Sequence, residues 1–336
     1  MTHLLPASPE YKEICLLLDS ADDSYWRPAV EYICRKYDLS DSNASRIHEG
    51  GNLLYQIDDN LILKIVPPNW RYQGESEIVA NDLLKGKLSV TIPELIHYGE
   101  LDNWLYLIMR RLDGISLAQV WAKLGIANKR SIIEHLGQLM KEIHQLAVDK
   151  NGMHGNAKQI APNWKDYYQQ LKNDCVPRHQ RKNVAPDLVE QIDSYFKASK
   201  TDDDSILDDL AEEAPPIFIH MDLHPWNLMV KEIDGEYKVT GILDFGDAVI
   251  GKSRLLELAT PLLFMCQGNA ELCRLLIESY GLLEQCPAEE LQGRLMAVSL
   301  LRPACDFNFV LAQVPETAPR TSWQAIARQL FPFSDS

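Results

Sequence analysis

His220-Met221-Asp222-Leu223-His224-Pro225-Trp226-Asn227 and Asp244-Phe245-Gly246 are the two polar clusters that decide how this chain of 336 residues folds. Each cluster directly follows a short apolar run, Ile217–Ile219 in the first case and Val239–Leu243 in the second. Such runs are typical of buried strands, and the interval between the clusters fits a hairpin that turns at Asp234-Gly235. We therefore expect both clusters to lie at strand ends, held beside each other by the hairpin.

The residue types in these clusters are those that phosphoryl transfer needs. Asp222 and Asn227 are five residues apart, the D-x-x-x-x-N interval of kinase catalytic loops, and Asp244 follows seventeen residues later. Magnesium prefers hard oxygen ligands, which Asn227 and Asp244 supply, while Asp222 is placed to orient an acceptor hydroxyl and take its proton. Either cluster alone is more often an Asx turn or an ordinary strand exit. The pair at this spacing predicts a site for ATP and Mg²⁺.

The first 113 residues supply candidates for the ATP side of this site. Lys64 alternates with apolar residues in the predicted third strand, from where it can reach the α- and β-phosphates. A carboxylate on the following helix would hold it, and we favour Glu77 over Glu75. Gly50 and Gly51 lie where a phosphate-covering loop belongs, although the stretch is not G-x-G-x-x-G.

The adenine edge has its own candidates. The stretch Leu107–Leu112 leads from the predicted sheet into the helical part of the chain. We expect backbone groups near Arg110 and Leu112 to read the adenine.

The hydrophobic periodicity predicts an α+β protein with two lobes. A helical pattern occupies the first forty residues, and a sheet with one helix after its third strand follows. From Ser116 onward the chain is mostly helical, with an apolar stripe near Lys129–Leu146. We assign residues 1–113 to an ATP-binding lobe. Residues 114–336 form a lobe with the catalytic loop, the metal site and the acceptor pocket. The predicted segments of the first lobe are strands at Ser45–His48, Leu53–Ile57, Leu61–Val66, Glu94–Gly99 and Leu105–Arg110, and a helix at Gln73–Lys85.

Composition excludes several classes of function. The net charge of −15 disfavours non-specific nucleic-acid binding; it fits a neutral or cationic partner, or simply serves solubility, which we favour. No apolar run approaches the roughly 20 residues that span a bilayer, and the N-terminus lacks the pattern of a secretion signal. Seven scattered cysteines without a C-x-x-C pair predict a reduced, cytoplasmic protein. The oligomeric state is left open.

The chain resembles the aminoglycoside phosphotransferase and choline kinase superfamily, which has a protein-kinase-like fold with a small sheet lobe and a larger helical lobe. The family motif His-Gly-Asp-x-x-x-x-Asn and the following Ile-Asp-Phe/Trp match here at His220–Asn227 and Leu243–Phe245, and the likeness runs from about Asp22 to the last helices. It is greatest to hygromycin B phosphotransferases of the 7″-modifying type, through Asp22–Trp26, Glu49–Asn52 and Val239–Phe245.

The chain departs from the family pattern in places. Met221 replaces the glycine of His-Gly-Asp, and Glu257-Leu258-Ala259 stands where Asp-Leu-Ala is usual. Because of these departures, the family pattern does not predict which residues line the acceptor pocket here. Asp247 and Glu257 are acidic candidates for that role. We expect His220 to brace the catalytic loop through a backbone hydrogen bond. For Trp226 we favour packing beneath that loop over stacking on a substrate.

The resemblance implies a small-molecule kinase whose leading acceptor is an aminoglycoside or aminocyclitol. A metabolic kinase for choline, homoserine, a thio-sugar or a natural product remains an alternative, as do GTP in place of ATP and a non-catalytic nucleotide-binding pseudokinase. A protein kinase is disfavoured, since only about nine residues separate Asp244 from the helix near Arg254 and no Ala-Pro-Glu follows.

Overall fold

The computed structural model describes residues 3–48, 51–148, 160–199, 215–282 and 287–333. The chain divides into two compact units. Unit 1 comprises Met1–Lys87, Thr91–Asp113 and Gly241–Gly246, and unit 2 comprises Leu88–Val90, Gly114–Thr240 and Asp247–Ser336. The main division therefore follows Asp113, but the segment that carries Asp244 joins unit 1. None of the described helices has the length and apolarity needed to cross a bilayer.

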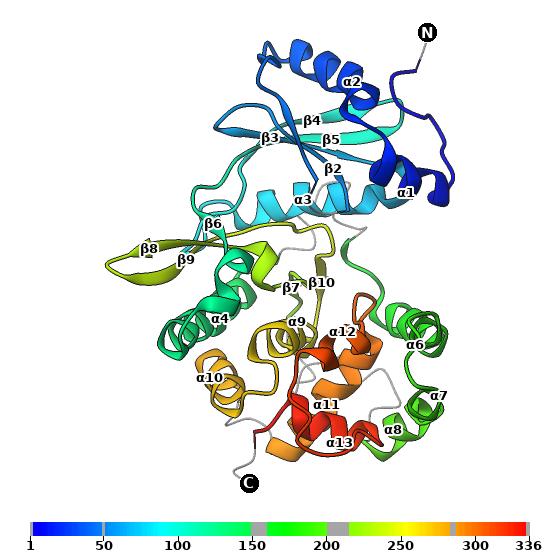
Figure 1. Ribbon diagram of the computed structural model, residues 1–336, viewed down its shortest axis with the longest axis vertical. Coiled ribbons are helices and arrows are strands. Elements are labelled where there is room, and N and C mark those ends of the chain that lie inside the picture. Colours follow the sequence, from blue (N-terminus) through cyan, green and yellow to red (C-terminus); the bar gives the residue numbers. More distant parts are fainter. Residues whose placement is uncertain (1–2, 49–50, 149–159, 200–214, 283–286, 334–336) are drawn as a thin grey trace. The chain divides into compact units, whose positions relative to one another are not determined.

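Unit 1 is built on a five-stranded antiparallel sheet in the order β1-β2-β3-β5-β4 (Figure 1). The strands are β1 (Ser45–Ile47), β2 (Leu53–Gln56), β3 (Leu61–Val66), β4 (Leu95–Leu101) and β5 (Trp104–Arg110). A short turn, η1 (Pro68–Trp70), leads from β3 into helix α3 (Arg71–Leu84). The five predicted strands and the predicted helix are confirmed, with ends shifted by no more than about two residues.

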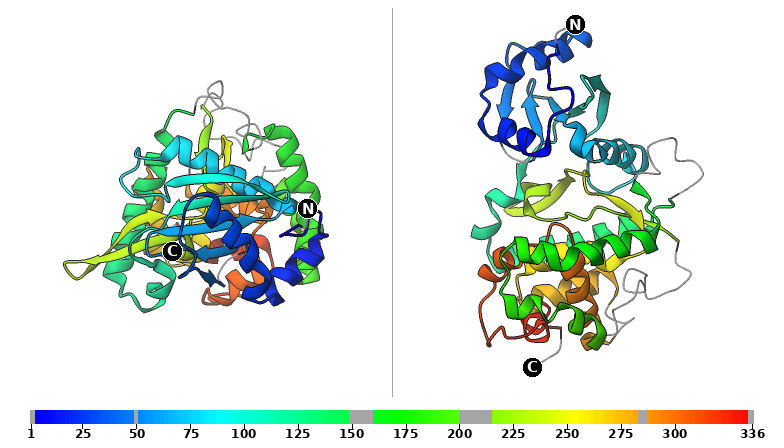
Figure 2. Two further views of the ribbon diagram at one scale, coloured as in Figure 1. Left: turned by 90° about the horizontal axis from the view of Figure 1, so that it is seen from above. Right: turned by 90° about the vertical axis from the view of Figure 1, so that its right-hand side faces the viewer.

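Alternation along the strands separates two cores in unit 1. Leu63 and Ile65 of β3 join the cluster that contains Trp26 of helix α2 (Asp23–Lys36), whereas Val66 joins the cluster that contains Ile78 of α3. Side chains of adjacent strand residues point to opposite faces, so α2 and α3 cover opposite faces of the sheet (Figures 1 and 2).

The helical pattern predicted for the first forty residues corresponds to two helices. These are α1 (Tyr11–Ser20) and α2 (Asp23–Lys36). The break has a local cause, because the side chain of Asp22 accepts a hydrogen bond from Tyr25 N and caps the start of α2.

The segment with Asp244 is attached to unit 1 by main-chain contacts. Thr91 forms a parallel bridge with Gly241, and its carbonyl accepts a hydrogen bond from Ile242 N at 3.0 Å. A Cβ at Gly241 would lie 2.6 Å from the side chain of Leu112 and 3.2 Å from Thr91 O, so a larger residue there would force its neighbours to shift. These contacts carry the chain directly into Asp244.

Unit 2 combines helices with two small sheets. Strand β7 (Ile217–Ile219) pairs with β10 (Val249–Gly251), and β8 (Leu228–Ile233) lies between β6 (Ile115–Ser116) and β9 (Glu236–Ile242). The predicted hairpin is formed by β8 and β9. Asp234 and Gly235 have φ values of 55° and 82°, as a two-residue turn of type I′ requires.

Helices enclose these sheets. Helix α4 (Ile126–Gln145) packs against α10 (Ala270–Tyr280) and β7, while α9 (Arg254–Pro261) packs against α11 (Ala288–Leu301) and β7 (Figure 1). The remaining helices are α6 (Trp164–Arg181), α7 (Pro186–Val189), α8 (Ile192–Ala198), α12 (Phe307–Ala312) and α13 (Trp323–Leu330), with short turns η2 (Leu117–Gln119), η3 (Trp121–Lys123), η5 (Pro225–Asn227) and the π-helical turn η6 (Leu262–Cys266).

Candidate active site

A buried lysine lies between two carboxylates in unit 1. Lys64 Nζ is 2.7 Å from Glu77 Oε1 and 2.9 Å from Asp244 Oδ1. Lys64 points to the α3 face of the sheet because its neighbours Leu63 and Ile65 occupy the opposite face. Glu75 is used elsewhere, since it accepts from Arg71 Nε at 2.9 Å. The structure thus pairs the lysine with Glu77, as we favoured.

The charge of Lys64 is maintained despite its burial. Desolvation by itself would lower the pKa of Lys64, but the attraction of Asp244 and of Glu77 outweighs it and holds that pKa above its ordinary value. The side chains of Lys64 and Glu77 are each only 5% exposed, so water screens the pair little. The result is a fixed ammonium group of the kind that can stabilise phosphate oxygens.

Asp244 is presented by an unusual backbone conformation. Its φ of 59° is in the left-handed region, which a non-glycine residue adopts only where surrounding contacts hold it. Gly246 N donates to Asp244 Oδ1 at 3.4 Å, and the ring of Phe245 is buried. The side chain of Asp244 is 50% exposed, so it offers carboxylate oxygen to solvent. This donor chemistry fits a magnesium ion.

The other ATP-side candidates are placed as follows. Gly50 lies outside the described residues, whereas Gly51 has open space where a Cβ would be. Arg110 N donates to Glu94 O at 2.8 Å and its guanidinium to Glu94 Oε2, so these donors are used within the sheet. Leu112 comes after the last residue of β5 and is buried.

The predicted catalytic loop in unit 2 brings Asp222 and Asn227 together. Asn227 Nδ2 donates to Asp222 O at 3.0 Å and to Asp222 Oδ2 at 3.2 Å. An amide carries its oxygen on the opposite side from its nitrogen, so the oxygen of Asn227 is directed away from Asp222. A carbonyl oxygen in that position suits a hard cation such as magnesium. His220 Nδ1 accepts from Asp222 N at 3.3 Å, which is the bracing contact predicted for His220.

Cationic and polar neighbours keep Asp222 ionised. His224 Nε2 is 3.1 Å from Asp222 Oδ2, and Arg302 Nη2 is 3.5 Å from Asp222 Oδ1. Burial favours the neutral acid, but the hydrogen bond from His224 and the charge of Arg302 outweigh it, so the pKa of Asp222 lies below its ordinary value. Asp222 is therefore a carboxylate at neutral pH. Such a group orients a hydroxyl and can receive its proton late in a transfer step.

The loop conformation around Met221 explains why glycine is usual at this place in the motif. Met221 has a φ of 72°, and its side chain is buried. Its carbonyl accepts from Arg302 Nη2 at 2.6 Å and from Thr260 Oγ1 at 2.9 Å. These bonds and the packing of the side chain hold a conformation that glycine adopts without strain.

Glu257 corrects one of our expectations. We named it as a candidate for the acceptor pocket, but it is fully buried and accepts from the main-chain N–H groups of His220 and Met221, at 2.5 and 3.2 Å. A buried carboxylate needs hydrogen-bond donors, and the turned backbone at Met221 presents two of them. Glu257 therefore shapes the catalytic loop. Asp247, the other acidic candidate, lies on the surface.

Trp226 corrects a second expectation. It does not pack beneath the catalytic loop, because 52% of the residue is exposed. The main chain of this turn is held by Ser116, whose Oγ donates to Pro225 O at 3.2 Å and to Trp226 O at 3.4 Å. The indole ring instead lies edge-to-face against His224, with 5.3 Å between centroids.

Sequence reasoning missed His224 and Arg302 as partners of Asp222. His224 had a signal, since it stands two residues after Asp222 in the same polar cluster. Arg302 had none, because it follows Met221 by 81 residues and reaches it only through the packing of α11.

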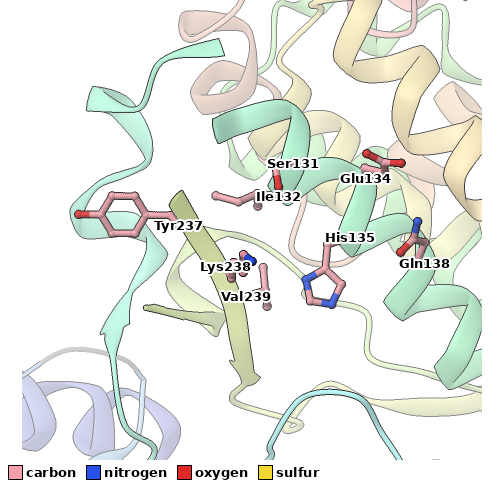
Figure 3. A pocket seen from close by; sticks show the side chains of 8 residues that line it. All are labelled: Ser131, Ile132, Glu134, His135, Gln138, Tyr237, Lys238 and Val239. Atoms are coloured by element: carbon pink, nitrogen blue, oxygen red, sulfur yellow. The ribbon is translucent and has the colours of Figure 1, made fainter. Parts of the chain in front are cut away.

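A separate cavity of about 320 Å³ lies between α4 and β9 in unit 2 (Figure 3). None of its lining residues belongs to the two motifs, so we assign it no catalytic role. These residues are Ser131, Ile132, Glu134, His135, Gln138, Tyr237, Lys238 and Val239.

Solved structures share this fold. The GDP complex of wild-type aminoglycoside 2'-phosphotransferase-IIIa is 17% identical, with a TM-score of 0.64 over 91% of this chain and 97% of that chain. The streptomycin–ATP complex of APH(2″)-IIa is 16% identical, with a TM-score of 0.57 over 81% and 89%. The complex of APH(3″)-Id from Streptomyces rimosus with ADP and streptomycin is 14% identical, with a TM-score of 0.55 over 82% and 98%. The predicted α+β, protein-kinase-like fold is confirmed by these matches.

Sequence comparison assigns the family. No curated protein matches the chain. The model of a family described as the phosphotransferase enzyme family matches residues 44–289, from β1 to the start of α11, and so covers β3, α3 and both polar clusters. The chain therefore belongs to the phosphotransferase enzyme family.

Proposed function

We propose that this enzyme transfers the γ-phosphoryl group of ATP to a hydroxyl of a small molecule, with magnesium. The observation that carries the proposal is the buried Lys64 ammonium between Glu77 and Asp244, because a fully ionised group is otherwise costly inside a protein. Phosphoryl transfer would account for this buried positive charge, because catalysis of the reaction consists mainly of positioning the reactants and neutralising phosphate charge.

Each predicted residue receives a role in this reaction. Asp222 hydrogen-bonds the acceptor hydroxyl, whose oxygen attacks the γ-phosphorus as the bond to the β,γ-bridging oxygen breaks. ADP leaves with that oxygen, and the hydroxyl proton passes to Asp222 and then to solvent. Lys64, oriented by Glu77, neutralises phosphate charge. Asn227 and Asp244 would hold magnesium, which neutralises charge on the phosphate oxygens when bound.

The remaining ATP contacts are proposed from the main chain. Gly50 and Gly51 would approach the phosphates closely, and the backbone around Leu112 would read the adenine edge. Arg110 N is already bonded within the sheet, so we place the reading groups beyond it. ATP and GTP both remain candidates, since the related complexes contain ATP, ADP or GDP.

An aminoglycoside or aminocyclitol is the leading acceptor. The names of related structures include streptomycin, gentamicin and kanamycin, which are ligands of those proteins. The net charge of −15 favours a cationic acceptor. A hygromycin B acceptor of the 7″ type is a narrower form of this proposal. Phosphorylation of such a compound would make antibiotic resistance the biological role, in the cytoplasm. A metabolic kinase for choline, homoserine or a sugar is the second candidate.

The test is ATP turnover with Mg²⁺ against kanamycin, streptomycin, hygromycin B, choline and homoserine, with mass detection of an added phosphoryl group. Asp222→Ala is compared with wild type, and Asp187→Ala, an exposed carboxylate on α7, serves as the matched control. A phosphorylated product from wild type and from the control, but not from Asp222→Ala, would support the proposal. Bound ATP with no turnover on any acceptor would favour a pseudokinase.

A further inference from the structure

Unit 2 carries an aromatic surface beside the predicted catalytic carboxylate, formed by Trp226, Phe264 and Phe309. Trp226 is 52% exposed, Phe309 is 48% exposed, and Phe264 is partly buried. The ring of His224 lies 5.3 Å from the ring of Trp226 and 5.9 Å from that of Phe264, and Phe264 lies 6.0 Å from Phe309. The four rings are therefore contiguous in the order Trp226, His224, Phe264 and Phe309.

This aromatic surface begins one side chain away from Asp222. The ring of His224 contacts Trp226 on one side and Phe264 on the other, and its Nε2 is also 3.1 Å from Asp222 Oδ2. A molecule lying on the rings would thus have its edge near the carboxylate that orients the reacting hydroxyl.

The rings are held in place by hydrogen bonds between their elements. Asp306 caps α12 by accepting from Phe309 N at 3.2 Å. Gln313 Nε2 donates to Phe309 O, and Gln267 Nε2 donates to Gln313 Oε1 at 2.8 Å. Gln267 ends the π-helical turn η6, which carries Phe264, and it has a φ of 50°. Phe264 and Phe309 are therefore aligned by a built network, as a binding surface requires.

The chemistry of exposed rings indicates what they bind. Single exposed apolar residues are normal on proteins, but a contiguous aromatic group beside a reactive side chain marks a ligand site. Aromatic faces pack against flat apolar surfaces, and each ring can cover a large area. We infer that Trp226, Phe264 and Phe309 bind the acceptor by packing against the apolar face of a ring that carries the reacting hydroxyl.

The inference rests on the proposed kinase activity and narrows its substrate class. It favours a cyclic acceptor, such as a sugar or cyclitol ring, over the open-chain alternative homoserine, whereas choline could use the same rings through its quaternary ammonium. It also predicts that recognition depends on ring contact and resists salt, whereas recognition by charge alone weakens as salt screens it.

The experiment replaces the most exposed ring. Trp226→Ala is compared with Trp226→Phe and with Tyr32→Ala, a matched control whose residue on α2 is 47% exposed. Acceptor KM is measured for kanamycin and for choline at low and high salt. We expect Trp226→Ala to raise the KM for kanamycin about tenfold, an effect on the order of one aromatic contact. Trp226→Phe should recover most of the loss, and the control should match wild type.

Binding is also measured without turnover, by ligand-observed saturation-transfer NMR with kanamycin and with methyl β-D-glucopyranoside. If wild type binds a probe through Trp226 but phosphorylates no acceptor, the kinase proposal fails, while the inference that the rings bind a cyclic ligand is supported. Turnover with an unchanged acceptor KM in both Trp226→Ala and Phe309→Ala would refute acceptor binding at the aromatic surface but support the kinase activity. Absence of saturation transfer to either probe would also overturn the surface.

Discussion

Replacing Lys64 by methionine should destabilise unit 1 strongly. The substitution keeps the volume roughly constant but removes the ammonium that is 2.7 Å from Glu77 and 2.9 Å from Asp244. Glu77 is only 5% exposed in its side chain and would be left as an uncompensated buried carboxylate. Breaking one partner of such a pair costs about 3–5 kcal/mol of unfolding free energy. With an m-value of about 2 kcal/mol/M, a loss of about 4 kcal/mol lowers the urea midpoint by about 2 M.

The second substitution separates stability from catalysis. Replacing Glu77 by leucine in the Lys64→Met protein removes the buried charge, so most of the lost unfolding free energy should return. Activity should not return, because no ammonium faces the phosphates. We expect kcat/KM to fall on the order of 10²–10³-fold or more in both variants.

The assays are urea unfolding followed by circular dichroism, and ATP turnover, with the exposed Lys87→Met as control. Burial raises the pKa of Glu77, so without Lys64 the folded state would bind more protons than the unfolded state above the ordinary pKa of 4.5. The stability deficit of Lys64→Met should therefore shrink as the pH falls from 8 to 5. A deficit below about 1 kcal/mol, or a double variant as unstable as the single one, would refute this account of the pair.

Three further predictions concern the catalytic loop. Glu257→Gln places an amide N–H against one of the two main-chain donors of His220 and Met221. It should lower the unfolding free energy by about 2–4 kcal/mol, seen as a lower melting temperature. An unchanged melting temperature would contradict the stabilising role of Glu257. His224→Gln removes the main contact that offsets the effect of burial on the pKa of Asp222, so this pKa should rise. The acid limb of the kcat/KM profile should then move to higher pH, which measurements from pH 4.5 to 8 would detect. Met221→Gly should be more stable than Met221→Ala by about 1 kcal/mol, because both lose the buried side chain but only glycine relieves the φ of 72°; the opposite order in urea unfolding would argue against backbone strain.

The strands and the predicted hairpin were readable from the sequence because their signals are local. The apolar alternation of Leu61–Val66 predicted β3 and also placed Lys64 on the face opposite Leu63 and Ile65. Asp234-Gly235 predicted the turn between β8 and β9. The helical pattern of the first forty residues did not indicate two helices, and the structure separates them at the cap of Asp22.

The sequence by itself determined the chemistry of this protein: a carboxylate and an amide five residues apart, a second carboxylate after the hairpin, and a lysine with an acidic partner on the following helix. Only the tertiary structure decided how Asp222 is held. Arg302 and Glu257 approach the loop through helix packing, and Glu257 bonds main-chain N–H groups, which every non-proline residue has. Sequence spacing carries no trace of such contacts, because they depend on where distant helices meet and on which backbone donors the turn at Met221 leaves to be satisfied.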